Sequence, residues 1–129
     1  MTRSLLDVQP ALVETVEDAE ACCAPVFDGP PALQPEEAAL HAAVLKALGD
    51  PHRLRMLSIM AAQPAGEPLC VCEIEGEFGL SQPTISHHLR VLREAGLVTV
   101  TKRGLWHYYA PAADGLAPVR RVLDTLAGV

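Results

Sequence analysis

The stretch GLSQPTISHHLRVLREAG, residues 79–96, decides the fold of this chain of 129 residues. It predicts a helix, because Ser81 is a favourable N-cap and the Gln-Pro pair after it suits a first helical turn. At about 100° per residue, Ile85, Leu89 and Leu92 lie within a narrow arc of that helix. These three residues predict a buried face, and the polar residues between them predict an accessible face on the opposite side.

A shorter helix precedes this one. It runs from about Cys70 to Phe78, places Val71 and Ile74 on one face and can end at Gly79. Two helices joined by the tripeptide Gly-Leu-Ser are typical of a helix-turn-helix, in which the second helix reads DNA.

Beyond Gly96, the sequence LVTVTKRGLWHYYA alternates on both sides of a glycine-containing turn, which predicts a β-hairpin. The elements therefore predict a mainly α (α+β) fold, a winged helix-turn-helix with a two-stranded β-hairpin as the wing. The composition agrees, because only 4% of the residues are aromatic and Ala, Leu and Val dominate.

Three further helices complete the predicted domain. Residues 36–48 predict a helix that Gly49 ends, and Asp50-Pro51 can cap the next one. The inward stripe predicted for that next helix is Leu54, Leu57, Ser58 and Ala61. The apolar seam of the last helix is Leu116, Val119, Leu123 and Leu126. An apolar seam that is so exposed on the last helix suggests an interface with a partner, and a second subunit is a candidate for that partner.

The charge is unevenly divided. The net charge of −6 and the pI of about 5.2 argue against a generally basic protein that coats nucleic acid. Residues 1–35, however, account for −5 and contain five prolines, which predicts an acidic, partly flexible arm that carries Cys22 and Cys23. Residues 36–129 then form the DNA-binding and dimerisation domain, and its segment 80–109 has a charge of +3.

The polar face of residues 82–94 and the tip of the hairpin are the candidate DNA contacts. Side chains near the start of the helix can reach base edges, a later arginine can read guanine or hold a phosphate, and the hairpin tip can follow the backbone or the minor groove. The predicted DNA-binding residues are Gln82, Thr84, Ser86, His87, Arg90, Lys102 and Arg103. His88 lies nearer the buried arc, which favours a packed histidine.

The four cysteines form two tight pairs, Cys22-Cys23 and Cys70-Val71-Cys72. Soft thiolates select As(III), Sb(III), Cd(II), Pb(II), Zn(II) or Cu(I) rather than Mg(II) or Ca(II). On a regular helix, however, positions i and i+2 diverge by about 200°. Cys70 and Cys72 can therefore bind one ion together only if the helix is distorted there or begins later.

Three segments together resemble the arsenic-repressor (ArsR/SmtB) family of bacterial metal-sensing repressors. They are KALGDPHRLRMLSIM, LCVCEIE and GLSQPTISHHLRVLREAGLVTVTKRGLWHYY, in this order between Lys46 and Tyr109. The resemblance implies a winged helix-turn-helix homodimer with the first and last helices at the interface. It further implies that the dimer binds an imperfect inverted repeat in double-stranded operator DNA and represses a resistance operon until a toxic ion binds.

The resemblance also suggests how the thiols are used. In relatives similar to the arsenite sensor a third cysteine follows the CVC pair three residues later, but Glu75 stands there in this chain. Other members bring cysteines from an N-terminal arm to the CVC segment. We therefore expect As(III), or Sb(III), to take three of the four thiolates, with a four-thiolate Cd(II) or Pb(II) site as the alternative. The metal-ligating candidates are Cys22, Cys23, Cys70 and Cys72.

Other functions are less well supported by the residues. A family zinc site needs an Asp-x-His motif, but Asp114 is followed by Gly115 and Leu116. A repressor that senses thiol oxidation would use the same cysteines. An enzyme such as a thiol oxidoreductase is not expected, because there is no βαβ frame, Gly-rich loop or Cys-x-x-Cys. A dimerisation module without DNA binding is disfavoured by the basic hairpin.

The apolar stretches are too short to span a membrane and the N-terminus lacks a signal-peptide pattern, which predicts a cytoplasmic protein.

Overall fold

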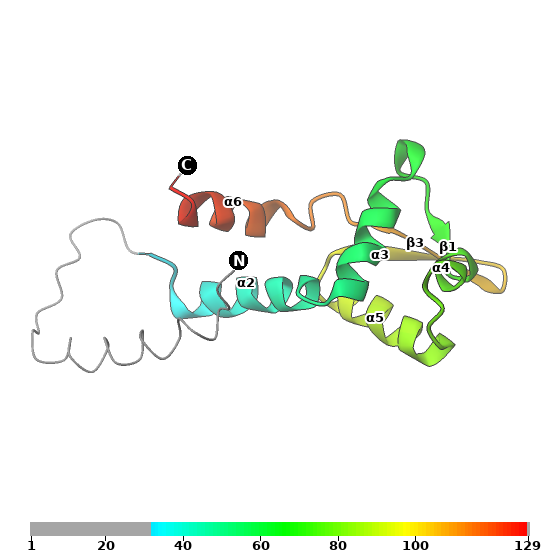
Figure 1. Ribbon diagram of the computed structural model, residues 1–129. Coiled ribbons are helices and arrows are strands. Elements are labelled where there is room, and N and C mark those ends of the chain that lie inside the picture. Colours follow the sequence, from blue (N-terminus) through cyan, green and yellow to red (C-terminus); the bar gives the residue numbers. More distant parts are fainter. Residues whose placement is uncertain (1–31, 129) are drawn as a thin grey trace, which may run out of the picture. The chain divides into compact units, whose positions relative to one another are not determined.

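The computed structural model describes residues 32–128, which form helices around a small sheet (Figure 1). A single 3₁₀ turn, Pro64–Gly66, lies between the second helix and the first strand. The elements in chain order are the helices α2 (Pro35–Leu48) and α3 (Pro51–Ala61), the strand β1 (Leu69–Cys70), the helices α4 (Val71–Phe78) and α5 (Gln82–Glu94), the strands β2 (Val98–Arg103) and β3 (Trp106–Pro111), and the helix α6 (Ala117–Leu126).

The sheet is antiparallel, with the strand order β1-β3-β2. The predicted hairpin is confirmed, and its last pair is Arg103 with Trp106, so that the turn consists of Gly104 and Leu105. Gly104 adopts a left-handed φ of 63°, which a residue without Cβ reaches at no steric cost. Strand β1 was not predicted, because a strand of only two residues shows no alternation in the sequence.

The helix α5 provides the centre of the core. Ile85, Leu89 and Leu92 are fully buried, at 0% exposure, which confirms the buried face predicted from their spacing. They pack in one cluster with residues of α3 and of the start of β2.

The inward stripe predicted for α3 is right only for Leu57, because the other three residues, Leu54, Ser58 and Ala61, are exposed. Leu54 is 56% exposed and Ser58 is also exposed, whereas Met56, Leu57 and Met60 face the core. The helix contains apolar residues on two overlapping faces, and the spacing of the leucines did not show which face the core would take. Unbranched methionine fills irregular core spaces well, and two methionines occupy these core positions.

The helices α2 and α6 lie side by side and away from the hairpin (Figure 1). On α6 the buried residues are Val119 and Val122, so only one member of the predicted four-residue seam faces the rest of the described chain. The other three, Leu116, Leu123 and Leu126, stay exposed. The two helices therefore keep an accessible apolar surface after the domain has folded.

Two further predictions concern the N-terminal arm and membrane-spanning segments. The acidic arm and its cysteines, Cys22 and Cys23, lie outside the described residues. Within residues 32–128, no helix is both long enough and apolar enough to cross a membrane.

Candidate DNA-binding face and thiol pair

The start of α5 is fixed by a side-chain cap. The hydroxyl of Ser81 accepts a hydrogen bond from the backbone N–H of Thr84 at 3.4 Å and bonds the Thr84 hydroxyl at 2.9 Å. The turn before it is closed by Gly79 in the left-handed region, with φ of 63°. The helix-turn-helix predicted from the sequence is therefore present as α4, this turn and α5.

Most side chains of α5 predicted to contact DNA are accessible, and one is hydrogen-bonded within the helix cap. Thr84 is half-buried, and its hydroxyl belongs to the cap. The remaining predicted residues of α5 are exposed, and Arg90 bonds the Nδ1 atom of His87 at 3.3 Å. The accessible members on α5 are Gln82, Ser86, His87 and Arg90. The structure thus presents a polar, partly basic face on α5.

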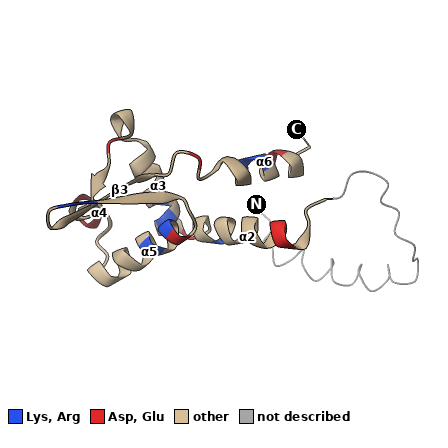
Figure 2. Ribbon diagram, turned by 180° about the vertical axis from the view of Figure 1, so that it is seen from behind, with Lys and Arg blue, Asp and Glu red and all other residues tan. Residues whose placement is uncertain are grey.

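The hairpin supplies the second basic element. Lys102 and Arg103 are both exposed at its tip, and the guanidinium of Arg103 lies 4.8 Å from the centre of the Tyr108 ring. Figure 2 shows blue at this tip and no red along the hairpin. A wing of this kind can contact the DNA backbone or the minor groove.

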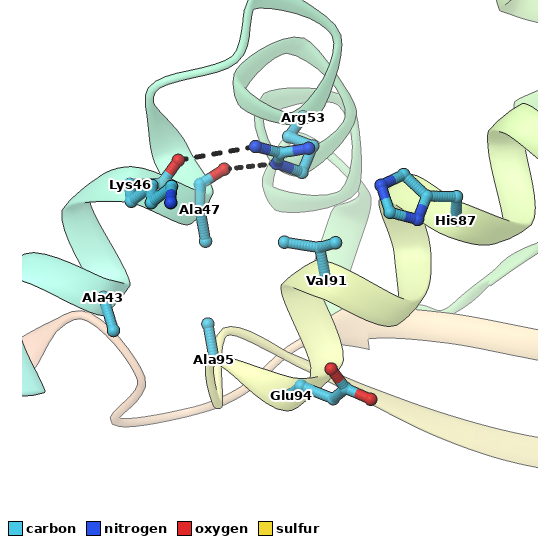
Figure 3. Close-up of a pocket in the computed structure, with 8 residues that line it drawn as sticks. All are labelled: Ala43, Lys46, Ala47, Arg53, His87, Val91, Glu94 and Ala95. Carbon is cyan, nitrogen blue, oxygen red and sulfur yellow. Dashed lines mark hydrogen bonds between the residues drawn. The ribbon is translucent and has the colours of Figure 1, made fainter.

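Arg53 and His88 form a junction between three helices that the sequence did not reveal. Arg53 donates from Nε to the carbonyl of Ala47 at 2.6 Å and from Nη2 to the carbonyl of Lys46 at 3.4 Å, so it binds the last turn of α2 (Figure 3). Its Nη1 atom lies 3.1 Å from the Nδ1 atom of His88, which is only 8% exposed on α5. Because arginine only donates, Nδ1 must accept, and the ring proton of neutral His88 is on Nε2.

Burial at this junction favours neutral His88. Burial lowers the pKa of His88 below 6.5, and Arg53 lowers it further, although Asp50 at 4.0 Å acts in the opposite direction. Burial alone would raise the pKa of Asp50, but the N–H groups of Arg53 and His52 that bond its carboxylate hold that pKa below its ordinary value. Protonation of His88 would place a cation against Arg53 and remove the acceptor of their hydrogen bond.

A pocket of about 420 Å³ opens between α2, α3 and α5 (Figure 3). Arg53 contributes to its wall, as do His87 and Glu94 from α5. The side chains of Ala43 and Ala95 are small, which leaves the space between the helices unfilled.

The thiol pair lies where β1 ends and α4 begins. Cys70 has extended backbone angles, φ −67° and ψ 143°, and is the N-cap of α4. Its sulfur accepts the N–H of Cys72 at 3.4 Å, and the carboxylate of Glu73 accepts the N–H of Cys70 at 2.9 Å. Because the helix begins at Val71, Cys70 is outside the regular helix, and the two sulfurs approach to 2.7 Å. A later helix start is one of the two conditions under which Cys70 and Cys72 were expected to be able to bind one ion together.

The two thiols are not equivalent. Cys70 is buried, whereas Cys72 is exposed. The hydrogen bond that the Cys72 thiol donates to Cys70 raises the pKa of Cys72, and desolvation adds to this shift. Among the described residues there is no cluster of three or more His, Cys, Asp or Glu side chains that could hold a metal ion. Residues 32–128 therefore bring two thiols together, Cys70 and Cys72.

The cap, the buried stripe of α5 and the basic hairpin define a winged helix-turn-helix DNA-binding protein. The description "Bacterial regulatory protein, arsR family" matches residues 50–100, which include α3, the thiol pair and the whole helix-turn-helix. The chain belongs to this family, and it is a transcriptional regulator rather than an enzyme.

Curated relatives support the assignment along most of the chain. The putative arsenical resistance operon repressor ArsR2 of Halobacterium salinarum is 38% identical over 122 residues, which cover 94% of this chain and 97% of the relative. The uncharacterized HTH-type transcriptional regulator MJ1325 of Methanocaldococcus jannaschii is 40% identical over 85 residues, which cover 66% and 92%.

A solved structure shows the same fold. The crystal structure of a possible transcriptional regulator for arsenical resistance matches with a TM-score of 0.58 and 34% identity, and the match covers 65% of this chain and 83% of that one. The expected family and fold are therefore confirmed by sequence and by structure.

Proposed function

We propose that the protein is a cytoplasmic metalloregulatory repressor, which binds operator DNA as a homodimer and releases it when As(III) or Sb(III) binds cysteine thiolates. The names of its relatives support this assignment, because they include a putative arsenical resistance operon repressor with similarity along almost the entire chain. The observation that carries the proposal is the contact of the Cys70 and Cys72 sulfurs at 2.7 Å, directly before the helix-turn-helix.

The chemistry of the pair suits a soft trivalent ion. Thiolates are the preferred ligands of soft and borderline ions, and two sulfurs that already touch need little movement to bind one centre. Cys70 and Cys72 supply two ligands, and Cys22 or Cys23 supplies the third, from the same subunit or from its partner. If both Cys22 and Cys23 contribute a thiolate, the resulting four-thiolate site would favour Cd(II) or Pb(II) instead.

The position of Cys70 suggests how the ion acts on DNA binding. Its sulfur accepts the N–H of Cys72 at the first turn of α4, so a ligand on this sulfur competes with a helix cap. A displaced α4 moves the turn that precedes α5, and the spacing of the recognition helices no longer fits the operator. A coupling free energy of about 3 kcal/mol would weaken operator binding by about two orders of magnitude.

The exposed apolar surface on α2 and α6 supports the homodimer. Leu40 on α2 is 69% exposed, and Leu123 and Leu126 on α6 are 46% and 71% exposed. A second copy can bury these leucines, and a two-fold dimer would place its two α5 helices in successive major grooves of an inverted repeat. In this complex the bases would be read by Gln82, Ser86, His87 and Arg90, with Thr84 at the helix start and with Lys102 and Arg103 on the wing.

The deciding experiment is a titration of the complex between the protein and a labelled DNA fragment from upstream of its own operon. As(III), Sb(III), Cd(II), Pb(II) and Zn(II) are added separately, and DNA release is followed by fluorescence anisotropy. We expect release at the lowest concentration with As(III) or Sb(III). Release by Cd(II) or Pb(II) alone would assign the site to those ions.

Cysteine variants test whether the thiols carry the response. C70S and C72S should bind the fragment as the wild type does and lose release by As(III), and C22S and C23S test the third ligand. If a variant with all four cysteines changed to serine still releases the DNA on addition of As(III), the thiol site is wrong. Release by a mild oxidant without any metalloid, reversed by a reductant, would instead support thiol-redox sensing.

A further inference from the structure

The tip of the wing exposes an apolar side chain where a solvent-facing turn would ordinarily carry a polar one. Leu105 is 89% exposed, the highest value among the exposed large hydrophobic residues of the described chain. It occupies the two-residue turn with Gly104, and its neighbour Trp106 is 52% exposed. Nothing in residues 32–128 covers this tip, and Leu105 contributes nothing to the core.

The charges beside Leu105 indicate what could cover it. From residue 97 to residue 113 the only Lys, Arg, Asp or Glu side chains are Lys102 and Arg103, so the hairpin carries cations and no carboxylate. Successive residues of a strand point to opposite faces, which places these two cations on opposite sides of the thin hairpin. The contact of Arg103 with the Tyr108 ring holds one of them against the strand.

This arrangement is complementary to one feature of double-stranded DNA. The minor groove is about 6 Å wide and has a phosphate backbone along each wall. A narrow turn with a cation on each face can place one cation toward each wall while its leading residue enters the groove. Apolar side chains that enter minor grooves, leucine among them, contact sugars and base edges and can open a base step.

We propose that Leu105 enters the minor groove beside the operator half-site and makes an apolar contact there, with Lys102 and Arg103 at the phosphates on either side. The inference rests on the proposed function, because it requires that the protein binds DNA through α5 and the wing. It adds a DNA contact that is apolar, and whose strength therefore does not depend on counterion release.

The test compares three variants with the wild type in binding to the upstream DNA fragment at several salt concentrations. We expect L105S to bind about tenfold more weakly with an unchanged salt dependence, since the lost contact is apolar. L105M keeps an apolar side chain and should bind within about twofold of the wild type. K102A should make the negative slope of log K against log salt shallower by about 0.9, the value for one phosphate contact.

The chain contains one tryptophan, Trp106, which gives an independent signal next to Leu105. In the wild-type complex, acrylamide should quench Trp106 fluorescence less than in the free protein. The inference is overturned if L105S binds like the wild type, if L105S and L105M lose affinity equally, or if DNA leaves Trp106 as accessible as before. A wild-type protein that binds no specific DNA would overturn the proposed function too, whereas binding that is insensitive to Leu105 overturns only this inference.

Discussion

Replacement of Arg53 by methionine tests the junction between α2, α3 and α5. Methionine keeps an unbranched side chain of similar reach, but it removes the guanidinium that binds the carbonyl of Ala47 and the Nδ1 atom of His88. The variant therefore leaves a buried imidazole acceptor without its donor and releases the last turn of α2.

The two shorter hydrogen bonds determine the expected loss. At 2.6 Å and 3.1 Å, the bonds from Arg53 to Ala47 and His88 have good distances, whereas the 3.4 Å bond to Lys46 contributes little. Hydrogen bonds to a charged group contribute about 1.5–3 kcal/mol each. Because Arg53 is only half-buried and water can replace part of the loss, we take the lower end for both bonds, about 3 kcal/mol. This is a large share of the 5–15 kcal/mol that stabilises an ordinary domain.

Urea unfolding followed by far-UV circular dichroism, at one fixed protein concentration, measures this loss. With an m-value of about 2 kcal/mol/M, the midpoint of R53M should fall by about 1.5 M. The matched control is R55M, on the same helix, where the exposed Arg55 lies 4.7 Å from the Phe78 ring and contributes about 0.5–1 kcal/mol. Equal midpoints for R53M and R55M would refute the reasoning that the junction ties the helices together.

Three further outcomes follow from the structure. Because burial lowers the pKa of His88, the folded protein binds fewer protons than the unfolded chain below pH 6.5, so stability should fall as the pH drops below this value. H88N should flatten this dependence in urea unfolding, and equal slopes would exclude His88 as its source. G115A should lose about 1–3 kcal/mol in thermal unfolding, since a Cβ there would lie 2.6 Å from the carbonyl oxygen of Gly96, and an unchanged melting temperature would argue against this close packing. L126E should give monomers in size-exclusion chromatography and lose operator affinity, and a dimer of normal affinity would place the interface elsewhere.

The helices and strands with a regular apolar pattern were predictable from the sequence. Three apolar residues at helical spacing identified the buried face of α5, and alternation around a glycine identified the hairpin. For α3 the spacing identified only Leu57 of the buried face, because apolar residues occur on more than one face of that helix and only the tertiary packing selects between them. Strand β1 exists through its pairing with β3, which two residues of sequence cannot show.

The candidate site was predictable in its residue types and less so in its geometry. The exposed polar face of α5 agrees with the prediction, but Thr84 turned out to be part of a cap. Whether Cys70 and Cys72 can meet depended on a helix boundary, which sequence patterns locate only within a few residues. The contact of Arg53 with His88 spans 35 positions and involves no periodic pattern, so only the structure could reveal it.

In the proposed mechanism, strand β1 would connect the thiol pair to the DNA-binding elements in a second way. Cys70 is paired in the sheet with Tyr108, whose ring carries the guanidinium of Arg103. A rearrangement of the backbone at Cys70 would therefore displace α5 through α4. It would also displace the wing, because Cys70 is paired with β3. If the DNA contacts of α5 and of the wing are both weakened, the two factors by which the DNA-binding constant falls multiply. A small displacement of each element would then be enough for the complex to dissociate.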